Sequence, residues 1–426
     1  MATERIHVTP SIRIPGSMEK HPPNWRWMPL DSICIGIYDC PHSTPKLTLE
    51  GPYVARTQDV ITGVFRSDGA AHVSQETYKD RIKRAEPSYG DLLYSREGTY
   101  FGIAAEVPSG VQVCLGQRMV LIRPDAAHVD HRFLRYWLNS PVMSAHVHGQ
   151  RDGSVAERLN LPTIRALPIP LPDSREQRRI AMALGALDDK IAVNERIAAT
   201  ADELTHALFT REFLASATPV PQDGWVSGHL SDICSTQYGY TASSSSEPVG
   251  PKFLRVKDIN KRNWVNWADV PYCEISERDL EKYQLSLGDV LVARMADPGK
   301  SAIVEESTDA VFASYLVRLK TPSLAHSYFV WGFLKSDAYA DYAESARGGS
   351  VQANMNAKVI VGAQLSIPPV EVMQQYLRLI APVRQRLTLA LRESQSLAAL
   401  RDTLLPQLMS GRLRVKDAEK IVEDHT

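Results

Sequence analysis

The stretch IAMALGALDDKIAVNERIAATADELTHAL, residues 180–208, decides the fold of this 426-residue chain. Nine positions along it are spaced alternately by four and three residues, and most are apolar or small: Ile180, Leu184, Leu187, Ile191, Asn194, Ala198, Ala201, Thr205 and Leu208. A repeat of 3.5 residues is typical of a coiled-coil helix, because it keeps one stripe of side chains facing a partner. A helix over residues 174–213 would be roughly 60 Å long.

The same spacing recurs 196 residues further along the chain, from Tyr376 through Leu404 to Leu408. We predict that the two helices pack antiparallel on each other, since neither apolar stripe can remain in water. The seam is predicted to consist of ten residues: Ile180, Leu184, Leu187, Ile191, Leu208, Ile380, Val383, Leu387, Leu397 and Leu404. The alternative is that each helix packs onto its own globular domain.

The repetition extends well beyond the helices. Trp25, Leu30, Ile33 and Cys34 recur 200 residues later as Trp225, Leu230, Ile233 and Cys234. Gly90-Asp91 matches Gly288-Asp289, and Gly153-Ser154-Val155 matches Gly349-Ser350-Val351. The chain is therefore two copies of one unit of roughly 200 residues, which is too long a period for a solenoid.

Each copy has the same internal plan. Short β-like runs with Gly, Pro and Asp turns come first, and a proline-marked strand end follows, ALPIPLP at 166–172 and AQLSIPP at 363–369. The predicted fold class is mixed α/β (α+β), with two tandem domains related by internal duplication and separated by two long antiparallel coiled-coil helices. The predicted domains are a first domain 1–172, a central helix 173–215, a second domain 216–368, a distal helix 369–414 and a C-terminal tail 415–426.

Composition restricts the class of protein. Hydrophobic residues make up 44% and charged residues 23%, which is the balance of a soluble globular protein. Five cysteines without a CxxC pair favour reduced thiols, no zinc site and a cytoplasmic location. No stretch approaches the ~20 apolar residues of a membrane span. A net charge of −1 and a pI near 6.9 argue against a nonspecific polyanion binder but not against a specific DNA reader.

Two segments resemble a known family. The set Pro172, Glu176, Gln177, Ile180, Ala181, Leu184, Leu187, Asp188 and Ile191 resembles the central conserved region of type I restriction-modification specificity subunits. Residues 400–411, LRDTLLPQLMSG, resemble the distal conserved region of the same family. The family order of domains and helices covers nearly the whole chain. The second copy departs from the pattern, because Val372 and Met373 stand where the first copy has Glu176 and Gln177.

The resemblance implies a noncatalytic DNA-sequence specificity subunit of a restriction system. Each target-recognition domain would read one half of a bipartite DNA site, and the helices would set the spacer and bind the modification (methyltransferase) subunits. Restriction (motor-nuclease) subunits are further expected partners. The chain itself would bind no cofactor; S-adenosylmethionine for DNA methylation, ATP and Mg are expected on partner subunits. Because the two copies differ strongly outside their shared positions, we predict an asymmetric target.

We identify no complete enzyme motif in the sequence. Pro298-Gly299-Lys300-Ser301 ends like a phosphate-binding loop, but the first glycine of that motif would fall at Arg294. The alternatives left open are the specificity component of a two-part enzyme without a motor, a coiled-coil adaptor that never touches DNA and, least favoured, an enzyme.

Candidate DNA contacts follow from chemistry, because phosphates and base edges favour Arg, Lys and polar side chains. The loops after the two Gly-Asp strands and before the two Gly-Ser-Val segments occupy equivalent places in both copies. Together with three residues of two basic clusters, they give the predicted set: Arg84, Ser95, Arg96, Thr99, Gln150, Arg151, Arg255, Lys257, Arg294, Lys300 and Arg347.

Overall fold

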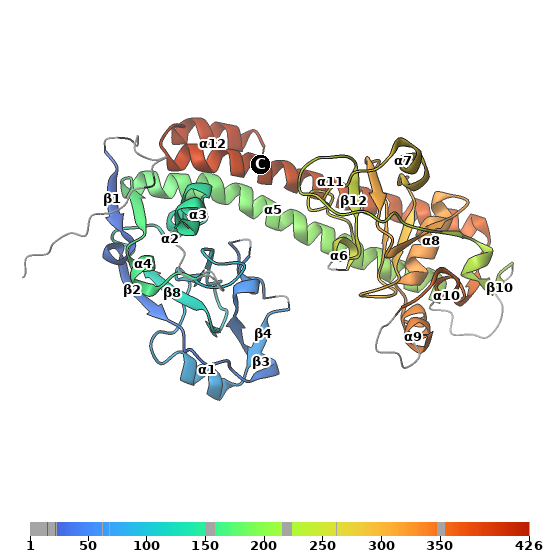
Figure 1. Cartoon of the computed structure of the whole chain (residues 1–426), viewed down its shortest axis with the longest axis horizontal. Helices are drawn as coiled ribbons and strands as arrows, with labels where there is room; N and C mark the ends of the chain where they lie inside the picture. The colour runs from blue at the N-terminus through green and yellow to red at the C-terminus, as the bar shows by residue number, and fades with distance from the viewer. Residues whose placement is uncertain are drawn as a thin grey trace, which may run out of the picture. The chain divides into compact units, whose positions relative to one another are not determined.

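The computed structural model describes residues 24–61, 63–67, 69–149, 158–214, 224–260, 262–346 and 354–425, with Pro15 and Pro22. Its packing divides the chain into two compact units (Figure 1). Unit 1 comprises residues 1–190 and 397–426, and unit 2 comprises residues 191–396. The two long helices α5 (Ser174–Phe209) and α11 (Val370–Met409) contribute to both units. Each unit is therefore one globular domain together with parts of both helices.

Three sheets build the domain of unit 1. The central sheet is antiparallel, in the order β2 (Cys34–Asp39), β8 (Met119–Pro124), β5 (Leu92–Ser95) and β6 (Ala104–Glu106). A second sheet has the order β4 (Ala71–Val73), β3 (Leu47–Ala55) and β7 (Val113–Leu115), in which β3 and β7 are parallel. The third is the antiparallel pair β1 (Arg26–Pro29) and β9 (Pro168–Leu171).

Unit 2 repeats this plan. Its central sheet has the order β11 (Ser235–Tyr238), β16 (Leu316–Lys320), β13 (Val290–Ala293) and β14 (Ser301–Ile303). The parallel pair β12 (Lys252–Leu254) and β15 (Ala310–Phe312) matches β3 and β7. The pair β10 (Val226–His229) and β17 (Gln364–Ile367) matches β1 and β9. The predicted internal duplication and mixed α/β class are confirmed.

The shorter helices also correspond between the units. Unit 1 contains α1 (Gln75–Arg81), α2 (His131–Leu138), α3 (Pro141–His148) and α4 (Leu161–Arg165). Unit 2 contains α6 (Val256–Ile259), α7 (Glu277–Tyr283), α8 (Leu324–Leu334), α9 (Asp337–Ala346) and α10 (Ala357–Ile360). Helices α1 to α4 match α7 to α10, and α6 matches the 3-10 turn Thr57–Asp59 of unit 1. Asn160 caps α4 and Asn356 caps α10 by accepting the N–H of Thr163 and Val359, each at 2.9 Å. The repeated asparagines are therefore helix caps.

The proline-marked segments are strands, and each leads into a long helix. Gln177, in the first turns of α5, is buried and accepts the N–H of Asp130 at 2.8 Å. Its amide group donates to the carbonyls of His128 and Pro172. The second copy has Met373 at this place, which is buried in the main apolar core of unit 2. The departure from the first-copy motif thus replaces a polar anchor by an apolar one.

In unit 2, α5 and α11 run antiparallel. Asn194 Nδ2 lies 2.8 Å from Glu393 Oε2, and Asp202 Oδ1 lies 2.8 Å from Arg384 Nη1, so the residue number rises on one helix as it falls on the other. Leu387 packs between them in a small cluster with Ala198 and Ala201. Small residues at this seam allow the two backbones to approach closely. In unit 1, Asp188 on α5 pairs with Arg401 on α11 at 2.8 Å.

Most of the predicted seam residues are buried. The fully buried ones are Ile180, Leu184, Leu187, Ile380, Leu387, Leu397 and Leu404. Ile191, Leu208 and Val383 are half-buried. Ile380 is part of the main core of unit 2, and Leu208 packs against it, so both contact the globular domain. Phe209 of α5 and Tyr376 of α11 also lie in that core. At this end the helices therefore pack onto the globular domain, as the alternative prediction states.

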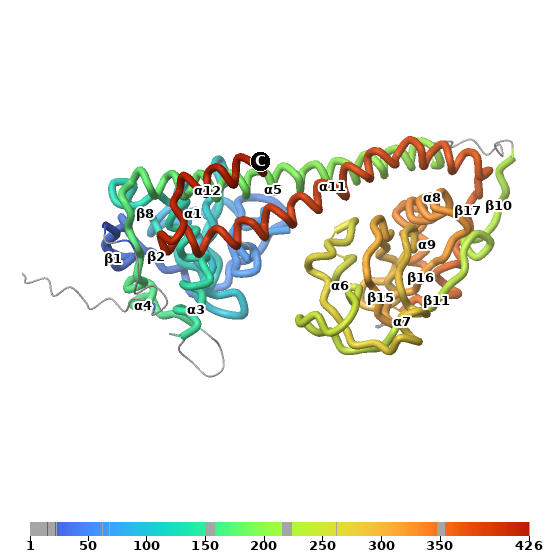
Figure 2. Tube along the Cα trace, turned by 90° about the horizontal axis from the view of Figure 1, so that it is seen from above, coloured from blue at the N-terminus to red at the C-terminus, as the bar shows by residue number. Residues whose placement is uncertain are grey.

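Helix α12 (Val415–Glu423) lies within the segment predicted as the C-terminal tail. Val415, Ala418 and Val422 are buried along one face of it. Arg179 on α5 donates from Nε to Glu419 Oε1 at 2.8 Å, and Figures 1 and 2 show α12 beside α5. In the part of the chain that is described, no helix is long and apolar enough to cross a membrane.

A buried arginine joins α11 to α5 and to the domain of unit 2. Arg384 is 2% exposed, and its guanidinium pairs with Asp202 and, through two hydrogen bonds of 2.6 and 2.7 Å, with Glu305. It also lies 4.8 Å from the centre of the Trp331 ring. The three charged groups satisfy one another away from water.

We predict that Arg384→Met lowers the free energy of unfolding by about 3–5 kcal/mol, because it leaves Asp202 and Glu305 buried without their counter-charge. Denaturant unfolding followed by tryptophan fluorescence measures the change. The control is Arg386→Met, which removes an exposed arginine two residues away on α11 and should change stability by no more than about 0.5 kcal/mol. Equal stability of the two variants would show that the buried network does not hold unit 2 together.

Candidate DNA-recognition site

The Gly-Asp strands are framework elements. Gly90 and Gly288 have φ values of +92° and +87°, a backbone conformation that glycine adopts without strain. The aspartate that follows each glycine pairs with an arginine of a neighbouring strand: Asp91 Oδ2 with Arg123 Nη2 at 2.7 Å, and Asp289 Oδ2 with Arg318 Nη1 at 3.0 Å. The repeated motif therefore fixes the position from which the next loop leaves the sheet.

The arginine at the start of that loop has a different partner in each unit. Arg96 donates to both carboxylate oxygens of Asp39, at 2.9 and 3.0 Å. The place of Asp39 in unit 2 is taken by Gly239, where an added Cβ would lie 2.3 Å from the Ala313 carbonyl oxygen.

Arg294 therefore meets no carboxylate at that place. Its guanidinium lies 5.0 Å from the centre of the Tyr238 ring and forms no ion pair with any described residue. Arg294 is only partly buried, and Tyr238 is 43% exposed. This arrangement leaves the guanidinium of Arg294 open to a ligand, whereas that of Arg96 is occupied.

The chain just after each Gly-Ser-Val segment lies beside the loop that follows each Gly-Asp strand. The carbonyl of Arg96 accepts the N–H of Leu159 at 2.8 Å, and the carbonyl of Arg294 accepts the N–H of Met355 at 2.9 Å. The chain that follows each Gly-Ser-Val segment is thus tied to the loop after each Gly-Asp strand. The predicted contacts Gln150, Arg151 and Arg347 lie outside the described residues.

The prediction that Ser95 contacts DNA is wrong. Its side chain is fully buried; the hydroxyl donates to the carbonyl of Tyr100 at 2.5 Å and accepts the N–H of Ile103. It closes the loop from within and cannot reach DNA. Thr99, at the tip of the same loop, is exposed.

Arg255, a further predicted contact, is partly buried and paired with an acid. Its guanidinium makes two hydrogen bonds to Asp258, of 2.9 and 3.0 Å, and Arg56 repeats this pair with Asp59 in unit 1. Both arginines stabilise the start of a short helical turn, so Arg255 is a framework residue. Lys257, two residues later, is exposed.

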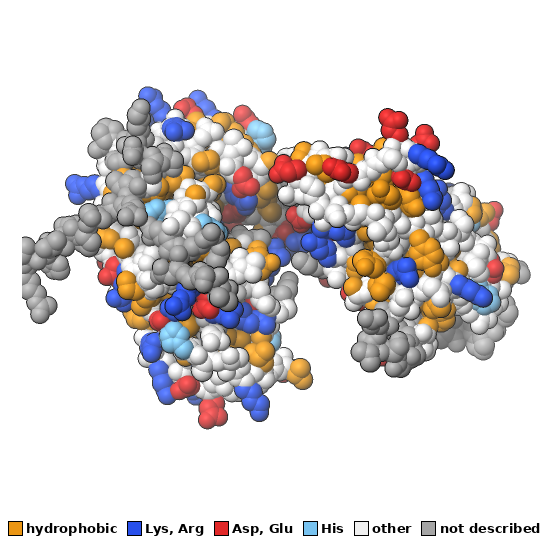
Figure 3. Space-filling view, viewed as in Figure 1, with side chains coloured by type: hydrophobic (Ala, Val, Ile, Leu, Met, Phe, Trp, Pro, Cys, Tyr) orange, Lys and Arg blue, Asp and Glu red, His pale blue; other side chains and the backbone are white. Residues whose placement is uncertain are grey.

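Arg84 is exposed and contacts the protein through one long hydrogen bond, from Nη1 to the carbonyl of Asp39 at 3.3 Å. Figure 3 shows further Lys and Arg side chains on this face of unit 1 around α1. Arg81, three residues earlier, is buried and donates to the carbonyls of Ser43 and Leu115. Arg84 thus remains a candidate for phosphate contact.

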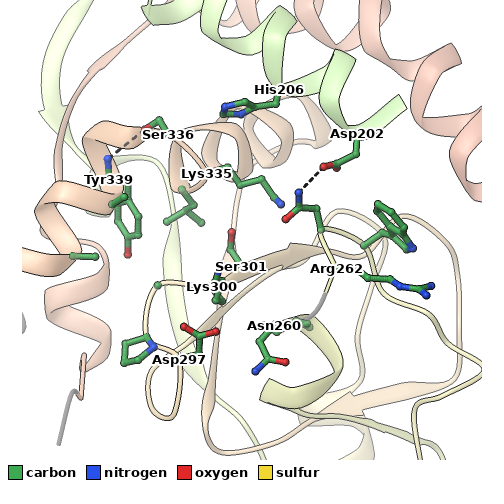
Figure 4. Close-up of a pocket in the computed structure, with 18 of the residues that line it drawn as sticks. Asp202, His206, Asn260, Arg262, Asp297, Lys300, Ser301, Lys335, Ser336 and Tyr339 are labelled. Atoms are coloured by element: carbon green, nitrogen blue, oxygen red, sulfur yellow. Dashed lines mark hydrogen bonds between the residues drawn. The ribbon is translucent and has the colours of Figure 1, made fainter. Parts of the chain in front are cut away.

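Both loops line a cavity in equivalent places. In unit 1 a cavity of about 380 Å³ is lined by the loop 99–103, by α2 and α3, and by Asp188 and Arg401 of the long helices. In unit 2 a cavity of about 680 Å³ is lined by the loop 297–301, by α8 and α9, and by Asp202 and His206 of α5 (Figure 4). The predicted contacts Thr99 and Lys300 lie on the walls of these cavities.

Lys335 is a cavity residue that the sequence prediction missed. It stands at the end of α8, where burial lowers the pKa of its ammonium group to about 8. The first copy has Asn139 at this place, and its amide pairs with both backbone groups of Ala104. The signal was present in the sequence as a lysine for an asparagine within the otherwise matching Leu138-Asn139-Ser140 and Leu334-Lys335-Ser336.

Burial favours the protonated form of the cysteine thiols. Burial raises the pKa of the Cys34 and Cys234 thiols to about 12 and that of the Cys114 and Cys273 thiols to about 11. Among the described residues, no group of three or more His, Cys, Asp or Glu side chains could hold a metal ion.

Comparison with known proteins adds to this geometry. Residues 50–202 match the model of the type I restriction modification DNA specificity domain. The MjaIX specificity subunit of a type I restriction enzyme from Methanocaldococcus jannaschii is 23% identical over 403 residues, which cover 89% of this chain and 88% of that protein. Residues 50–202 are thus similar to a DNA specificity domain, and nearly the whole chain is similar to a specificity subunit of a type I restriction enzyme.

Other relatives agree with this assignment. The HindI specificity subunit of a type I restriction enzyme from Haemophilus influenzae is 20% identical over 440 residues, covering 84% of this chain and 93% of that protein. The crystal structure of the type I restriction-modification S subunit from M. genitalium matches 90% of this chain and 96% of its own, with 15% identity and a TM-score of 0.54, and has the same fold. Both relatives are named as specificity subunits, and the matching family model is that of a DNA specificity domain.

We predict that Arg294→Ala weakens binding to the recognised DNA roughly tenfold without a change in thermal stability, because its guanidinium contributes little to packing. The control is the equivalent variant Arg96→Ala, which leaves Asp39 without its partner and should lower stability by about 1–2 kcal/mol. Fluorescence anisotropy with labelled duplex and thermal unfolding measure the two effects. Unchanged DNA affinity of the Arg294 variant would remove this residue from the recognition surface.

Proposed function

We propose that each of the two domains reads one half of a bipartite, asymmetric DNA site. The observation that carries this proposal is that one fold occurs twice with different chemistry at the same loop. Arg96 is bound to Asp39 in the first copy, whereas Arg294 lies over Tyr238 in the second. Two identical readers would favour a palindrome, and two unlike readers on one chain favour two different half-sites.

We further propose that the long helices set the spacer between the half-sites. The supporting observation is that α5 and α11 are each continuous, over 36 and 40 residues, and are fixed against each other by ion pairs. A continuous helix has a rise of about 1.5 Å per residue, which suits a measuring element.

The helices are also the proposed docking surface for the modification (methyltransferase) subunits. In unit 2 an apolar groove of about 570 Å³ runs along α5 and α11, lined by Val193, Ile197, Leu204 and Val383 and flanked by Arg196 and Arg386. Val193 and Leu204 are 38% and 45% exposed. An apolar groove with a charged rim suits an amphipathic helix of a partner.

The proposed assembly places the chemistry on other subunits. S-adenosylmethionine would bind to the modification subunits, and ATP and Mg to restriction (motor-nuclease) subunits. This chain would contribute binding energy and specificity alone.

We predict that cells carrying this chain with its modification subunits contain methyladenine at one split, asymmetric motif, and that this methylation disappears when the chain is deleted. Single-molecule methylome sequencing of both strains measures the difference and gives the target. Equal methylomes, with the modification subunits expressed, would contradict the proposed function, and a palindromic motif would contradict two unlike readers.

We predict that one heptad inserted into both helices changes the tolerated spacer between the half-sites, because it adds roughly 10 Å of helix. The facing pair Asn194 and Glu393 marks matched insertion points that preserve the antiparallel pairing. Methylome sequencing of the variant measures the new spacer. The control is a heptad inserted into α5 alone, which shifts the pairing and should abolish assembly; an unchanged spacer in the double insertion would exclude the measuring role.

A further inference from the structure

We propose that the cavity of unit 2 is a phosphate-binding site in which Lys300 and Lys335 hold a phosphate group of the DNA backbone. The identity of the phosphate as that of DNA rests on the proposed function. The site itself rests on four features of the cavity: its two lysines, the state of its acids, an unused buried hydroxyl and its difference from the cavity of unit 1.

The first feature is the charge of Lys335. Its ammonium group lies 4.8 Å from the centre of the Trp331 ring and forms no ion pair with a described residue. Burial is the main cause of the lowered pKa of Lys335; the nearby charges of Arg384 and Lys300 also lower this pKa, whereas Asp202 and Glu305 act in the opposite direction. A desolvated cation without a counter-ion is unfavourable, and an anion that enters the cavity removes this cost.

The second feature is that the nearest acid is already occupied. Asp202 binds Arg384 through Oδ1 and Asn263 through Oδ2, the latter at 2.7 Å. Asp297 and Glu344 also line the cavity, but neither forms an ion pair with Lys300 or Lys335 within the described chain. The two lysines thus have no direct carboxylate partner on the described walls of the cavity, although Asp202 lies near enough to favour the charged form of Lys335.

The third feature is an unused donor. Ser301, at the start of β14, is 6% exposed, and its hydroxyl has no hydrogen-bond partner among the described residues. Figure 4 shows Ser301 beside Lys300, with Lys335 extending into the space between Ser301 and the α5 residues His206 and Asp202. The Ser301 hydroxyl and the Lys335 ammonium group, in a cavity that Lys300 also lines, are suitable donors for a phosphate oxygen.

The fourth feature is the contrast with unit 1. Asn139 stands there in place of Lys335, and its side-chain amide is hydrogen-bonded to the backbone N–H and carbonyl of Ala104. The arginines of that cavity, Arg135 and Arg401, are both bound to Asp188. The first copy thus fills the equivalent space with paired groups, and the proposed anion site belongs to the second copy alone.

The test uses the full chain assembled with its modification subunits and three variants. Lys335→Met removes the charge but keeps the aliphatic stem over Trp331, and Lys335→Arg restores a charge. Lys320→Met is the matched control, because Lys320 is an exposed lysine of the same unit outside the cavity. Thermal unfolding is measured for each variant, so that a loss of folding is recognised.

Affinity for a duplex with the recognised sequence and for a scrambled duplex is measured by anisotropy at several salt concentrations. We expect Lys335→Met to weaken both roughly tenfold and to reduce the slope of log affinity against log salt by about 0.9. The ratio between the two duplexes stays constant, because a phosphate contact carries no base information. Lys335→Arg should recover most of the affinity, and Lys320→Met should change it less than twofold.

Inorganic phosphate, titrated calorimetrically into the DNA-free complex, distinguishes the source of the anion. Binding that is lost in Lys335→Met, with DNA affinity and salt slope unchanged, would support the anion site and overturn its assignment to DNA. No change in either measurement, or an equal loss in Lys320→Met, would overturn the site. A wild-type complex that does not discriminate between the two duplexes would contradict the proposed function, while the salt slopes would still decide the phosphate site.

Discussion

The buried guanidinium of Arg384 is the constraint on which unit 2 depends. An arginine that is 2% exposed must keep its counter-charges, and these come from two different elements: Asp202 from α5 and Glu305 from the globular domain. Its three hydrogen bonds fix the rotation of α11, because a shift of one residue would turn the side chain by about 100° away from both acids. The apolar contact of Leu387 with Ala198 and Ala201, one turn further on, then has a single register. The same Trp331 ring that lies against Arg384 also lies against Lys335, so the framework positions the proposed phosphate site directly.

The equivalent place in unit 1 has the opposite charge. Residue 188, which corresponds to 384 at the offset of 196, is an aspartate that accepts from Arg135, Tyr136 and Arg401. The two copies have the same strand order but attach the long helix to the domain with opposite charges, an aspartate on the helix in unit 1 and an arginine in unit 2. The inversion makes α5 and α11 non-interchangeable, since exchanging the helices would place like charges together. The polar pairs at the seam thus specify which helix belongs to which domain, in addition to stabilising the contact.

Local pattern predicted the fold well, and tertiary partners account for what it missed. The heptads, the strand ends at ALPIPLP and AQLSIPP and the duplication all depend on residues that are near in sequence or repeated at a constant offset. The guanidinium of Arg96 forms an ion pair with Asp39, which is 57 residues away on another strand. No spacing rule predicts that these two residues meet. Ser95 is buried because the loop folds back over it, which also depends on tertiary contacts. The role of Arg255 could have been foreseen, since Arg-x-x-Asp recurs in both copies and is a local cap.

Residues repeated at equivalent places in both copies were predicted to contact DNA, but repetition also marks residues of the common framework. Repeated arginines were ranked as DNA contacts, yet Arg255 is held by Asp258, and Arg56 by Asp59, as parts of the common framework. Arg294, Lys300 and Lys335, at which the copies differ in sequence or in surroundings, form no ion pair with a described residue. Under the proposed function, a duplicated reader keeps its scaffold and changes its contacts in order to recognise two sequences, so divergence is the better guide to the contacts. A net charge of −1 fits this view, because it does not favour binding to DNA without regard to sequence.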